Sequence, residues 1–326
     1  MYREARPRPA ATATFGAALL LLVGCKGKTT DDSGDSAEEV SPWSVPSEAV
    51  GDAMLLSAWS EGDAMLVVGG DLGEETAHGD LLRYEAGTIC VEEAVTDQPL
   101  WWIHGTGEGE WYAVGAGGTV LHESGGERVR EDLDTEATLF GVWDDGEGTV
   151  WAVGGHVDDN TGEIWRRTDG TWEAVQTGLD GMVFKVWDGW FVGVDLSFRL
   201  VEGELEPITT DMRMVTARGR DGDDVWVVGG ATGSEVARWD GSGWEAWDTT
   251  YLGTPLNGVW TDDGEEVWIT GNSGTMAWWG GERWEIPDLP LTSDHFHAVW
   301  KHQGEVWFVG GNFFSAGDNH GTMGRY

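Results

Sequence analysis

The sequence predicts an all-β protein, a seven-bladed β-propeller of four-stranded blades that is closed by its N-terminal strand. Three observations predict this fold. The 326 residues include 51 Gly and 22 Trp but only 9 Pro, as many short strands joined by tight turns require. A short apolar strand that ends in glycine recurs along the chain at intervals of about 40 residues. The chain also ends one strand short of its last repeat, and a matching strand lies near its start.

The clearest repeat unit, Leu139–Gln176, contains four short apolar runs that are separated by Asp, Asn and Gly. Runs of this length and composition indicate four antiparallel strands, and no segment past residue 30 has the 3.6-residue apolar period of a helix. We expect the first strands of the seven units at Leu55–Trp59, Leu100–His104, Leu139–Trp143, Val183–Trp187, Met214–Arg218, Leu256–Trp260 and Phe296–Trp300. The second strands end at Gly69, Gly115, Gly154, Gly193, Gly229, Gly271 and Gly310.

The last repeat lacks a fourth strand, because the chain stops at Tyr326, at the end of a third strand. The segment Ser41–Pro46 resembles the fourth strands around Trp172 and Trp284, so we expect it to be the outer strand of the last blade. A ring closed in this way leaves only short strand edges exposed. A linear solenoid would instead need polar capping repeats.

Two units, Gly141–Trp172 and Gly258–Trp284, carry the pattern GVW, then VW followed three residues later by Gly (VWAVG and VWITG), and a turn glycine before Trp. This pattern resembles the Asp-box-like (BNR-type) propeller repeats of bacterial lipoproteins and other surface proteins, and it covers residues 41–326. Thr168–Trp172 is one residue shorter than a true Asp box, which reads Ser-x-Asp-x-Gly-x-Thr-Trp. The resemblance implies a fold and no particular activity, because propellers host binding, hydrolysis and scaffolding alike.

The first 25 residues combine an arginine-containing start with the apolar run Ala10–Val23, which is short for a bilayer span but typical of a signal peptide. Leu22–Cys25 resembles the bacterial lipobox, which implies cleavage before Cys25 and a diacylglyceryl thioether on its sulfur. We therefore expect a lipoprotein signal peptide over 1–24. The alternative is an ordinary signal peptide with an incidental cysteine.

Residues 25–40 are polar, acidic and free of aromatics, so we expect a flexible tether between the lipid anchor and the propeller at 41–326. Lys26, next to the cysteine, favours delivery to the outer membrane or the cell surface over the inner membrane. With Cys25 lipidated, Cys90 would be the only thiol. We expect it to be a small buried apolar residue in a strand, with no intramolecular disulfide.

The charge balance excludes some partners. There are 58 acidic and 19 basic residues, which gives a net charge of −39. Phosphate binding needs clustered Lys and Arg, so we expect no nucleic acid partner. The acidic surface favours solubility and mutual repulsion, and we expect a monomer. The acidic runs Asp144–Glu147, Asp221–Asp224 and Asp262–Glu266 are expected to form equivalent hairpin turns on one face.

No catalytic constellation stands out, and we expect a protein that is not an enzyme. A sialidase-like site would need arginines that converge on a carboxylate, but the arginines of the third strands recur once per blade, which indicates structural pairing with acidic turns or Trp. No metal motif is present, and we expect no cofactor, although Asp158–Glu163 has oxygen ligands that make calcium an open alternative. The third-strand arginines are Arg83, Arg166, Arg199, Arg238 and Arg325.

Tryptophans that recur at repeat positions are predicted to pack between blades, because an indole buries a large apolar area. Aromatic residues outside the repeat pattern are better candidates for contacts with a partner. The recurring residues are Trp143, Trp151, Trp187, Trp190, Trp226, Trp260, Trp268, Trp300 and Trp307, and the others are Trp101, Trp102, Trp247, Phe313 and Phe314.

The long loops between second and third strands are Gly70–Asp80, Gly155–Gly162 and Gly311–Gly321. In a propeller they share a face with the connections between blades, so we expect this face to bind a protein or glycan partner. Neutral loop growth and a propeller-fold glycan hydrolase or lyase remain alternatives. The candidate binding residues are His78, Asp158, Asn160, Asn312, Phe313, Phe314, Asp318 and His320.

Overall fold

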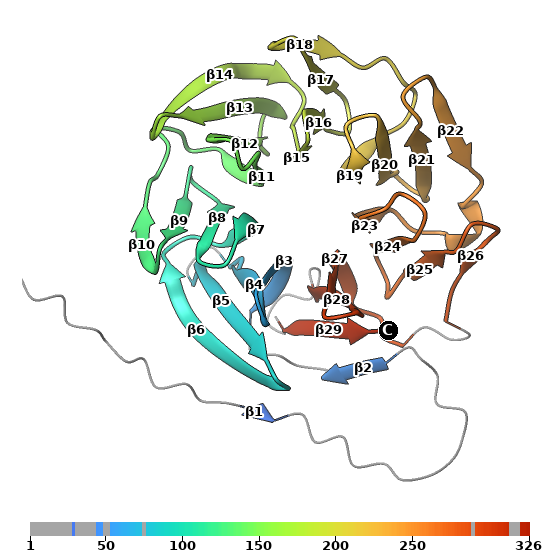
Figure 1. Cartoon of the computed structure of the whole chain (residues 1–326), viewed down its shortest axis with the longest axis horizontal. Helices are drawn as coiled ribbons and strands as arrows, with labels where there is room; N and C mark the ends of the chain where they lie inside the picture. Colours follow the sequence, from blue (N-terminus) through green and yellow to red (C-terminus); the bar gives the residue numbers. More distant parts are fainter. Residues whose placement is uncertain (1–27, 30–43, 48–52, 74–75, 288–290, 313–319) are drawn as a thin grey trace, which may run out of the picture.

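The computed structural model describes residues 28–29, 44–47, 53–73, 76–287, 291–312 and 320–326. Seven antiparallel sheets stand around a central axis, and each sheet forms one blade (Figure 1). The predicted seven-bladed β-propeller of four-stranded blades is confirmed. The described residues contain a single helical element, the 3-10 turn η1 (Thr250–Leu252).

Each of the first four blades is a meander in which the first strand lies next to the axis (Figure 1). Blade 4 has the shortest inner strands. Blade 1 contains β3 (Met54–Glu61), β4 (Ala64–Asp71), β5 (His78–Glu85) and β6 (Thr88–Thr96), and blade 2 contains β7 (Leu100–Gly107), β8 (Glu110–Gly115), β9 (Val120–Ser124) and β10 (Glu127–Arg130). Blade 3 contains β11 (Thr138–Asp144), β12 (Thr149–His156), β13 (Thr161–Thr168) and β14 (Thr171–Asp180), and blade 4 contains β15 (Lys185–Trp187), β16 (Trp190–Val192), β17 (Ser197–Val201) and β18 (Glu204–Pro207).

The remaining blades follow the same order, except that the last one takes its outer strand from the other end of the chain. Blade 5 contains β19 (Met214–Asp221), β20 (Asp224–Gly229), β21 (Glu235–Trp239) and β22 (Trp244–Trp247), and blade 6 contains β23 (Leu256–Trp260), β24 (Val267–Gly271), β25 (Met276–Trp279) and β26 (Trp284–Glu285). Blade 7 contains β27 (His295–His302), β28 (Glu305–Gly311), β29 (Gly321–Arg325) and β2 (Ser44–Ser47).

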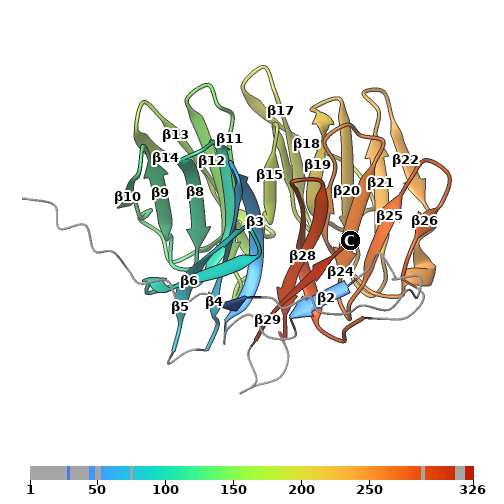
Figure 2. The ribbon, with the colours of Figure 1, turned by 60° about the horizontal axis from the view of Figure 1, so that its bottom comes forward.

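The ring closes through β2, which pairs antiparallel with β29. Ser44 lies opposite Arg325 and Ser47 lies opposite Met323, with a register shift between them. Figure 2 shows β2 beside β29 at the edge of blade 7. The predicted closure by the N-terminal strand is therefore confirmed. The paired segment extends one residue beyond the predicted Ser41–Pro46, and the first three residues of that range lie outside the described residues.

The recurring glycine that marks each repeat has a steric cause. The first strand bulges after its opening residue, for example between Leu139 and Gly141, and the bulge brings a backbone carbonyl against the second strand. A Cβ at Gly154 would lie 2.1 Å from the carbonyl oxygen of Thr138. All seven glycines meet a carbonyl in this way, so only glycine fits the position. The distances from a Cβ to that oxygen are 1.8 Å at Gly69, 2.1 Å at Gly115 and Gly193, 1.9 Å at Gly229 and Gly310, and 2.4 Å at Gly271.

The tryptophans of the second strands fill the spaces between blades, as predicted. Trp151, Trp190, Trp226, Trp268 and Trp307 are each at most 4% exposed. Full burial of an indole contributes on the order of a few kcal/mol per residue. Apolar contacts between neighbouring blades therefore hold the ring together.

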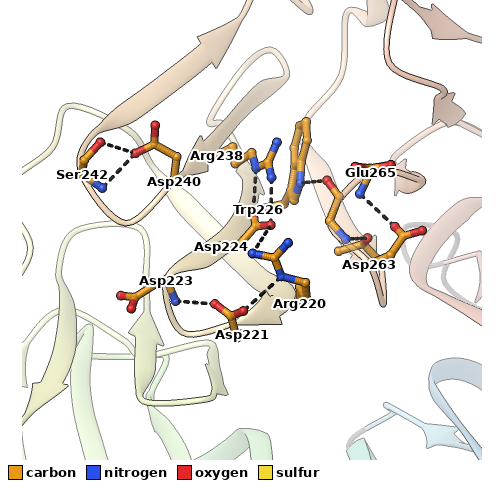
Figure 3. A network of polar contacts seen from close by, with 12 residues as sticks. Arg220, Asp221, Asp223, Asp224, Trp226, Arg238, Asp240, Ser242, Asp263 and Glu265 are labelled. Carbon is orange, nitrogen blue, oxygen red and sulfur yellow. Dashed lines mark hydrogen bonds and ion pairs between the residues drawn. The ribbon is translucent and has the colours of Figure 1, made fainter.

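Four of the five third-strand arginines cover these indoles, in line with the predicted structural pairing. In blade 5, Arg238 lies opposite Trp226 in the sheet, with its guanidinium 5.7 Å from the ring centroid. Its Nε and a terminal nitrogen donate to the two oxygens of buried Asp224, at 2.6 and 2.8 Å (Figure 3). The Trp226 indole N–H donates to the carbonyl of Gly264 in the next blade, at 3.0 Å. The motif thus links an acidic turn, an arginine and the neighbouring blade.

The other third-strand arginines pair in the same manner, in blades 1, 3, 4 and 7. Their partners are acidic residues near the ends of the sheets, and each except Arg83 also covers an indole. Arg83 pairs with Glu61, Arg166 with Glu173 over Trp151, Arg199 with Asp223 over Trp190, and Arg325 with Glu305 over Trp307.

Two features of blade 1 differ from expectation. The strand β1 (Lys28–Thr29), within the predicted tether, pairs antiparallel with β6, where Lys28 lies opposite Ile89. Cys90, on the same strand β6, is half-buried and disulfide-bonded. The expectation of a buried free thiol at Cys90 is therefore wrong. The other cysteine of the chain, Cys25, lies outside the described residues.

No helix in the part of the chain that the structure describes is both long and apolar enough to cross a membrane.

Candidate functional site

A cavity lies on the central axis, where first strands from all seven blades meet. The cavity volume is about 20 Å³, which is room for about one water molecule. A bulky ligand does not fit inside. The lining residues are Ala58, Trp102–His104, Val142, Trp143, Lys185–Trp187, Thr216–Arg218, Gly258, Val259 and Ala298–Trp300.

Lys185 extends from β15 into this cavity and is 4% exposed. Its Nζ donates to the carbonyl oxygen of Phe140 at 2.5 Å and lies 3.9 Å from the ring centroid of Trp102, two blades away. Burial lowers the pKa of Lys185 to about 7, because the charged ammonium is poorly solvated there.

Arg218, on the next blade, supplies a second cation. Its Nε donates to the carbonyl oxygen of Thr261 at 3.0 Å, and its guanidinium lies 4.4 Å from the ring centroid of Trp300. Burial lowers the pKa of Arg218 to about 10, against a weaker opposing effect of Asp262. Within the described residues, neither Arg218 nor Lys185 has a carboxylate within ion-pair distance.

Two histidines near the cations are neutral at physiological pH. His104 accepts a hydrogen bond at Nδ1 from the backbone N–H of Asp144, at 3.1 Å, so its proton is on Nε2. The Nδ1 of His297 lies 2.5 Å from the carbonyl oxygen of Leu56, which requires the opposite tautomer. Burial lowers both pKa values to about 3, with a further contribution from Arg218 at His104 and from Lys185 at His297.

One end of the channel is acidic, because every first strand leads into a turn that contains Asp or Glu or is closely followed by one. Several of these carboxylates hold the turn itself. Asp145 Oδ1 accepts from the N–H groups of Glu147 and Thr149, at 2.7 and 2.9 Å. Asp263 Oδ1 accepts from two backbone N–H groups in the same way. The predicted equivalent acidic turns are confirmed.

The opposite end of the channel carries aromatic rings from blades 7, 2, 3 and 4, at the starts of the first strands. The centroid of Trp101 lies 5.1 Å from that of Phe140 and 5.8 Å from that of His297, and Phe140 lies 5.3 Å from Phe184. We call these four residues the aromatic arc. In an antiparallel meander the blade connections and the second-to-third-strand loops share this end, which we call the loop face.

The loop face contains those predicted binding residues that the structure describes. Asp158 and Asn160 lie in the exposed turn between β12 and β13, beside Val157, which is 64% exposed. Asn160 Nδ2 lies 3.4 Å from Asp195 Oδ2 of the next blade. The predicted binding residues Phe313, Phe314 and Asp318 lie outside the described residues.

The remaining candidates are tied to their own blades. His78 Nδ1 lies 2.7 Å from the carbonyl oxygen of Thr76 and its Nε2 lies 3.4 Å from Asp80. Burial acts to lower the pKa of His78, but this hydrogen bond and the charges of Asp80 and Asp71 raise it overall.

His320 Nε2 lies 3.0 Å from Asp294, and the N–H of Asn312 donates to the carbonyl oxygen of His320 at 3.3 Å. The structure thus places the described candidates on one face, but it does not join them into one cluster of contacts.

The segment proposed for calcium forms a hydrogen-bonded hairpin turn. Asp159 Oδ1 accepts from the hydroxyl of Thr161 at 2.7 Å and from its N–H at 3.2 Å. The hydroxyl bond lowers the pKa of Asp159. No group of three or more His, Cys, Asp or Glu side chains in the described ranges is arranged to hold a metal ion.

The channel cations were missed at the level of sequence, although a signal was present. The first strands end in Trp in five of seven blades, and Arg218 and His104 occupy the two other equivalent positions. Lys185 lies at a position held elsewhere by small residues or by Trp102. Of the non-repeat aromatics, Trp101 and Trp102 reach the channel. Trp247 is partly buried and stacks on Trp226, with ring centroids 4.5 Å apart, so it contributes to the packing between strands.

Comparisons with solved structures agree with this fold. No family model and no curated protein sequence matches the chain. A structure described as YCF48 bound to D1 peptide superposes with a TM-score of 0.64 at 17% identity, over 89% of this chain and 98% of that chain. YCF48 from Cyanidioschyzon merolae gives a TM-score of 0.63 at 16% identity, over 88% of this chain and 99% of that chain. The WD40 β-propeller domain of Doa1 gives 0.63 at 10% identity, over 87% and 96%. These likenesses show the fold.

Proposed function

We propose that this chain is a non-enzymatic binding propeller, anchored by lipid in the cell envelope, that holds a protein or glycan partner on its loop face. The observation that carries the proposal is the apolar surface of the loop face. It consists of the hairpin tip at Val157, which is 64% exposed, and the partly exposed rings of Trp101 and Phe184 in the aromatic arc. Aromatic and apolar groups of this kind are typical of binding surfaces.

The neighbouring propellers support a protein partner over a glycan. The structure of YCF48 was obtained with D1 peptide bound. The likeness does not transfer that peptide to this chain, but it favours a role in which the ring serves as a rigid platform for a polypeptide.

The channel composition favours binding over glycan cleavage. A glycosidase of the common type needs two carboxyl groups on the order of 5–9 Å apart. Among the described residues, no Asp or Glu lines the central cavity. The alternative, a glycan hydrolase or lyase, predicts new reducing or unsaturated sugar ends when the protein is incubated with envelope glycans.

The binding role is tested by exchanging one exposed side chain. Val157→Asp places a charge on the loop face, and Val129→Asp is the matched control on β10, where Val129 is 44% exposed. We expect Val157→Asp to reduce capture of a partner from envelope fractions, with the control unchanged. Equal capture by the wild type and both variants would contradict the proposal.

The lipid anchor is a separate part of the proposal. Cys25 lies outside the described residues, and a Cys25 sulfur in a thioether is not available for a disulfide with Cys90. Cys90 is disulfide-bonded in the structure, and Cys25 is the only other cysteine in the sequence. In a lipidated chain Cys90 would therefore be a thiol or would be bonded to another chain. Labelled palmitate should enter the wild type and not Cys25→Ala. Equal labelling of both proteins, or labelling of neither, would contradict the lipid anchor. Mass spectrometry of the Cys90 peptide shows whether its sulfur is a thiol or part of a disulfide.

A further inference from the structure

The central channel concentrates positive charge in a chain with a net charge of −39. Lys185 and Arg218 line one cavity, and none of the chain's 58 acidic residues lines it within the described ranges. Each cation contacts a backbone carbonyl and an aromatic face. These contacts use one N–H group of each cation. Within the described residues neither cation has a carboxylate at ion-pair distance, although Asp262 acts on Arg218 from farther away, and this arrangement favours an anion at this place.

The two ends of the channel differ in what an entering anion meets. Acidic turns surround the end next to Arg218 and repel a negative charge. The aromatic arc lies at the other end, on a face whose loops also carry carboxylates such as Asp158 and Asp294. An anion that enters past the arc places an attached apolar stem against the partly exposed rings of Trp101 and Phe184.

We propose that the channel is a carboxylate-binding site, with Lys185 and Arg218 supplying the positive charge and the aromatic arc contacting the stem of the ligand. The planar guanidinium matches a carboxylate better than it matches a round ion. The cavity holds about one water-sized group, so an oxygen of the carboxylate enters it and the rest of the ligand lies toward the aromatic arc. The carboxylate belongs to a small organic acid or to the end of a polypeptide.

Binding is coupled to protonation of Lys185. The pKa of this lysine is about 7 without an anion, and a bound carboxylate raises it. The other charged or titratable groups that face it are Arg218, His104 and His297. Arg218 remains charged near neutral pH, and both histidines remain neutral. Affinity is therefore highest below pH 7 and declines as the pH rises above it, and binding near pH 7 takes up a proton.

The experiment is calorimetry on the full chain with three probes: acetate, phenylacetate and the tripeptide Gly-Gly-Phe, the last with a free or an amidated C-terminus. Lys185→Met and Arg218→Met remove one charge each, and Arg218→Lys restores charge. Arg220→Met is the matched control, because Arg220 lies on the same strand, is exposed and pairs with Asp221 at 3.1 Å.

We expect the wild type to bind phenylacetate more tightly than acetate, and each Met variant to lose at least about tenfold in affinity, as removal of a charged partner predicts. Arg220→Met should bind as the wild type, and Arg218→Lys should recover part of the loss. Binding of the free tripeptide but not of its amide identifies a polypeptide end as a ligand, and binding of the small acids alone identifies a free acid.

Two results overturn the inference: no heat of binding for any probe up to about 10 mM, or binding that is unchanged in Lys185→Met and Arg218→Met. Proton uptake, measured from the wild type in two buffers of different ionisation enthalpy, keeps the test decisive if a variant does not fold. Absence of uptake at pH 7 excludes Lys185. The result does not depend on the proposed partner or lipid anchor, because the probes are small molecules.

Discussion

Replacement of the channel lysine by a neutral residue of similar length is predicted to stabilise the fold. Burial lowers the pKa of Lys185 from 10.5 to about 7, and each unit corresponds to about 1.4 kcal/mol. The charged lysine therefore destabilises the folded state by about 5 kcal/mol below pH 7, in the absence of a bound anion. Lys185→Met removes this penalty and gives up the hydrogen bond to Phe140 and the contact with Trp102, worth about 1 kcal/mol. The expected net gain at pH 6 is about 4 kcal/mol.

The pH dependence of this gain distinguishes it from better packing. Because the pKa of Lys185 is lower in the folded state, the unfolded chain binds more protons between pH 7 and 10.5. The free energy of unfolding of the wild type should therefore rise through this window, and the advantage of Lys185→Met should shrink by about 2–3 kcal/mol from pH 6 to pH 9.

Denaturant unfolding at pH 6 and pH 9, in buffers without carboxylates, measures this difference. Lys301→Met is the control, because Lys301 has a carboxylate partner, Glu266, at 3.0 Å, and its effect should be small and nearly independent of pH. A Lys185→Met variant that is destabilised equally at both pH values would refute the reasoning.

Three further predictions concern the repeat and its closure. Gly154→Ala should lower the free energy of unfolding by about 2 kcal/mol, because its Cβ would lie 2.1 Å from a carbonyl oxygen. The control Gly243→Ala, which has open space around it, should be near neutral. Equal effects of the two substitutions in denaturant unfolding would contradict this steric explanation. Arg238→Met should lower the free energy of unfolding by about 3 kcal/mol, because it removes the bidentate partner of buried Asp224. Arg166→Met should lower it by less than about 1 kcal/mol, because its partner Glu173 is 52% exposed. The same melting temperature for both variants would contradict this difference. Truncation through residue 47 removes β2, whereas truncation through residue 43 keeps it. The first protein should be less stable than the second by at least about 3 kcal/mol. Calorimetric transitions at the same temperature for both proteins would show that closure by β2 contributes little.

The architecture could be predicted because it is periodic. Each blade repeats the same local signals, an apolar strand, a turn and a glycine under a bulged carbonyl, so seven weak signals combine into a strong one. The closing strand could be found because Ser41–Pro46 resembles the other fourth strands. The pairing of the third-strand arginines followed from the same reasoning, since periodic placement indicates periodic structure.

The channel site was not predicted, because the residues that form it are far apart in the sequence. Lys185 is held by Phe140 and Trp102 from two other blades, and Arg218 by Thr261 and Trp300 from two more. In the sequence, Lys185 is an ordinary residue at the start of a short strand. Its burial, its lowered pKa and the exclusion of carboxylates from its surroundings exist only when the ring is complete.

The sequence by itself determined the repeat, the number of blades and the closure, because these depend on local patterns that recur. The tertiary structure alone decided that two cations share one cavity and that the rings of Trp101, Phe140, Phe184 and His297 gather at one mouth. The physical reason is that charge burial and solvation depend on the distance between residues in space. Only closure of the ring brings first strands from all seven blades to a common axis.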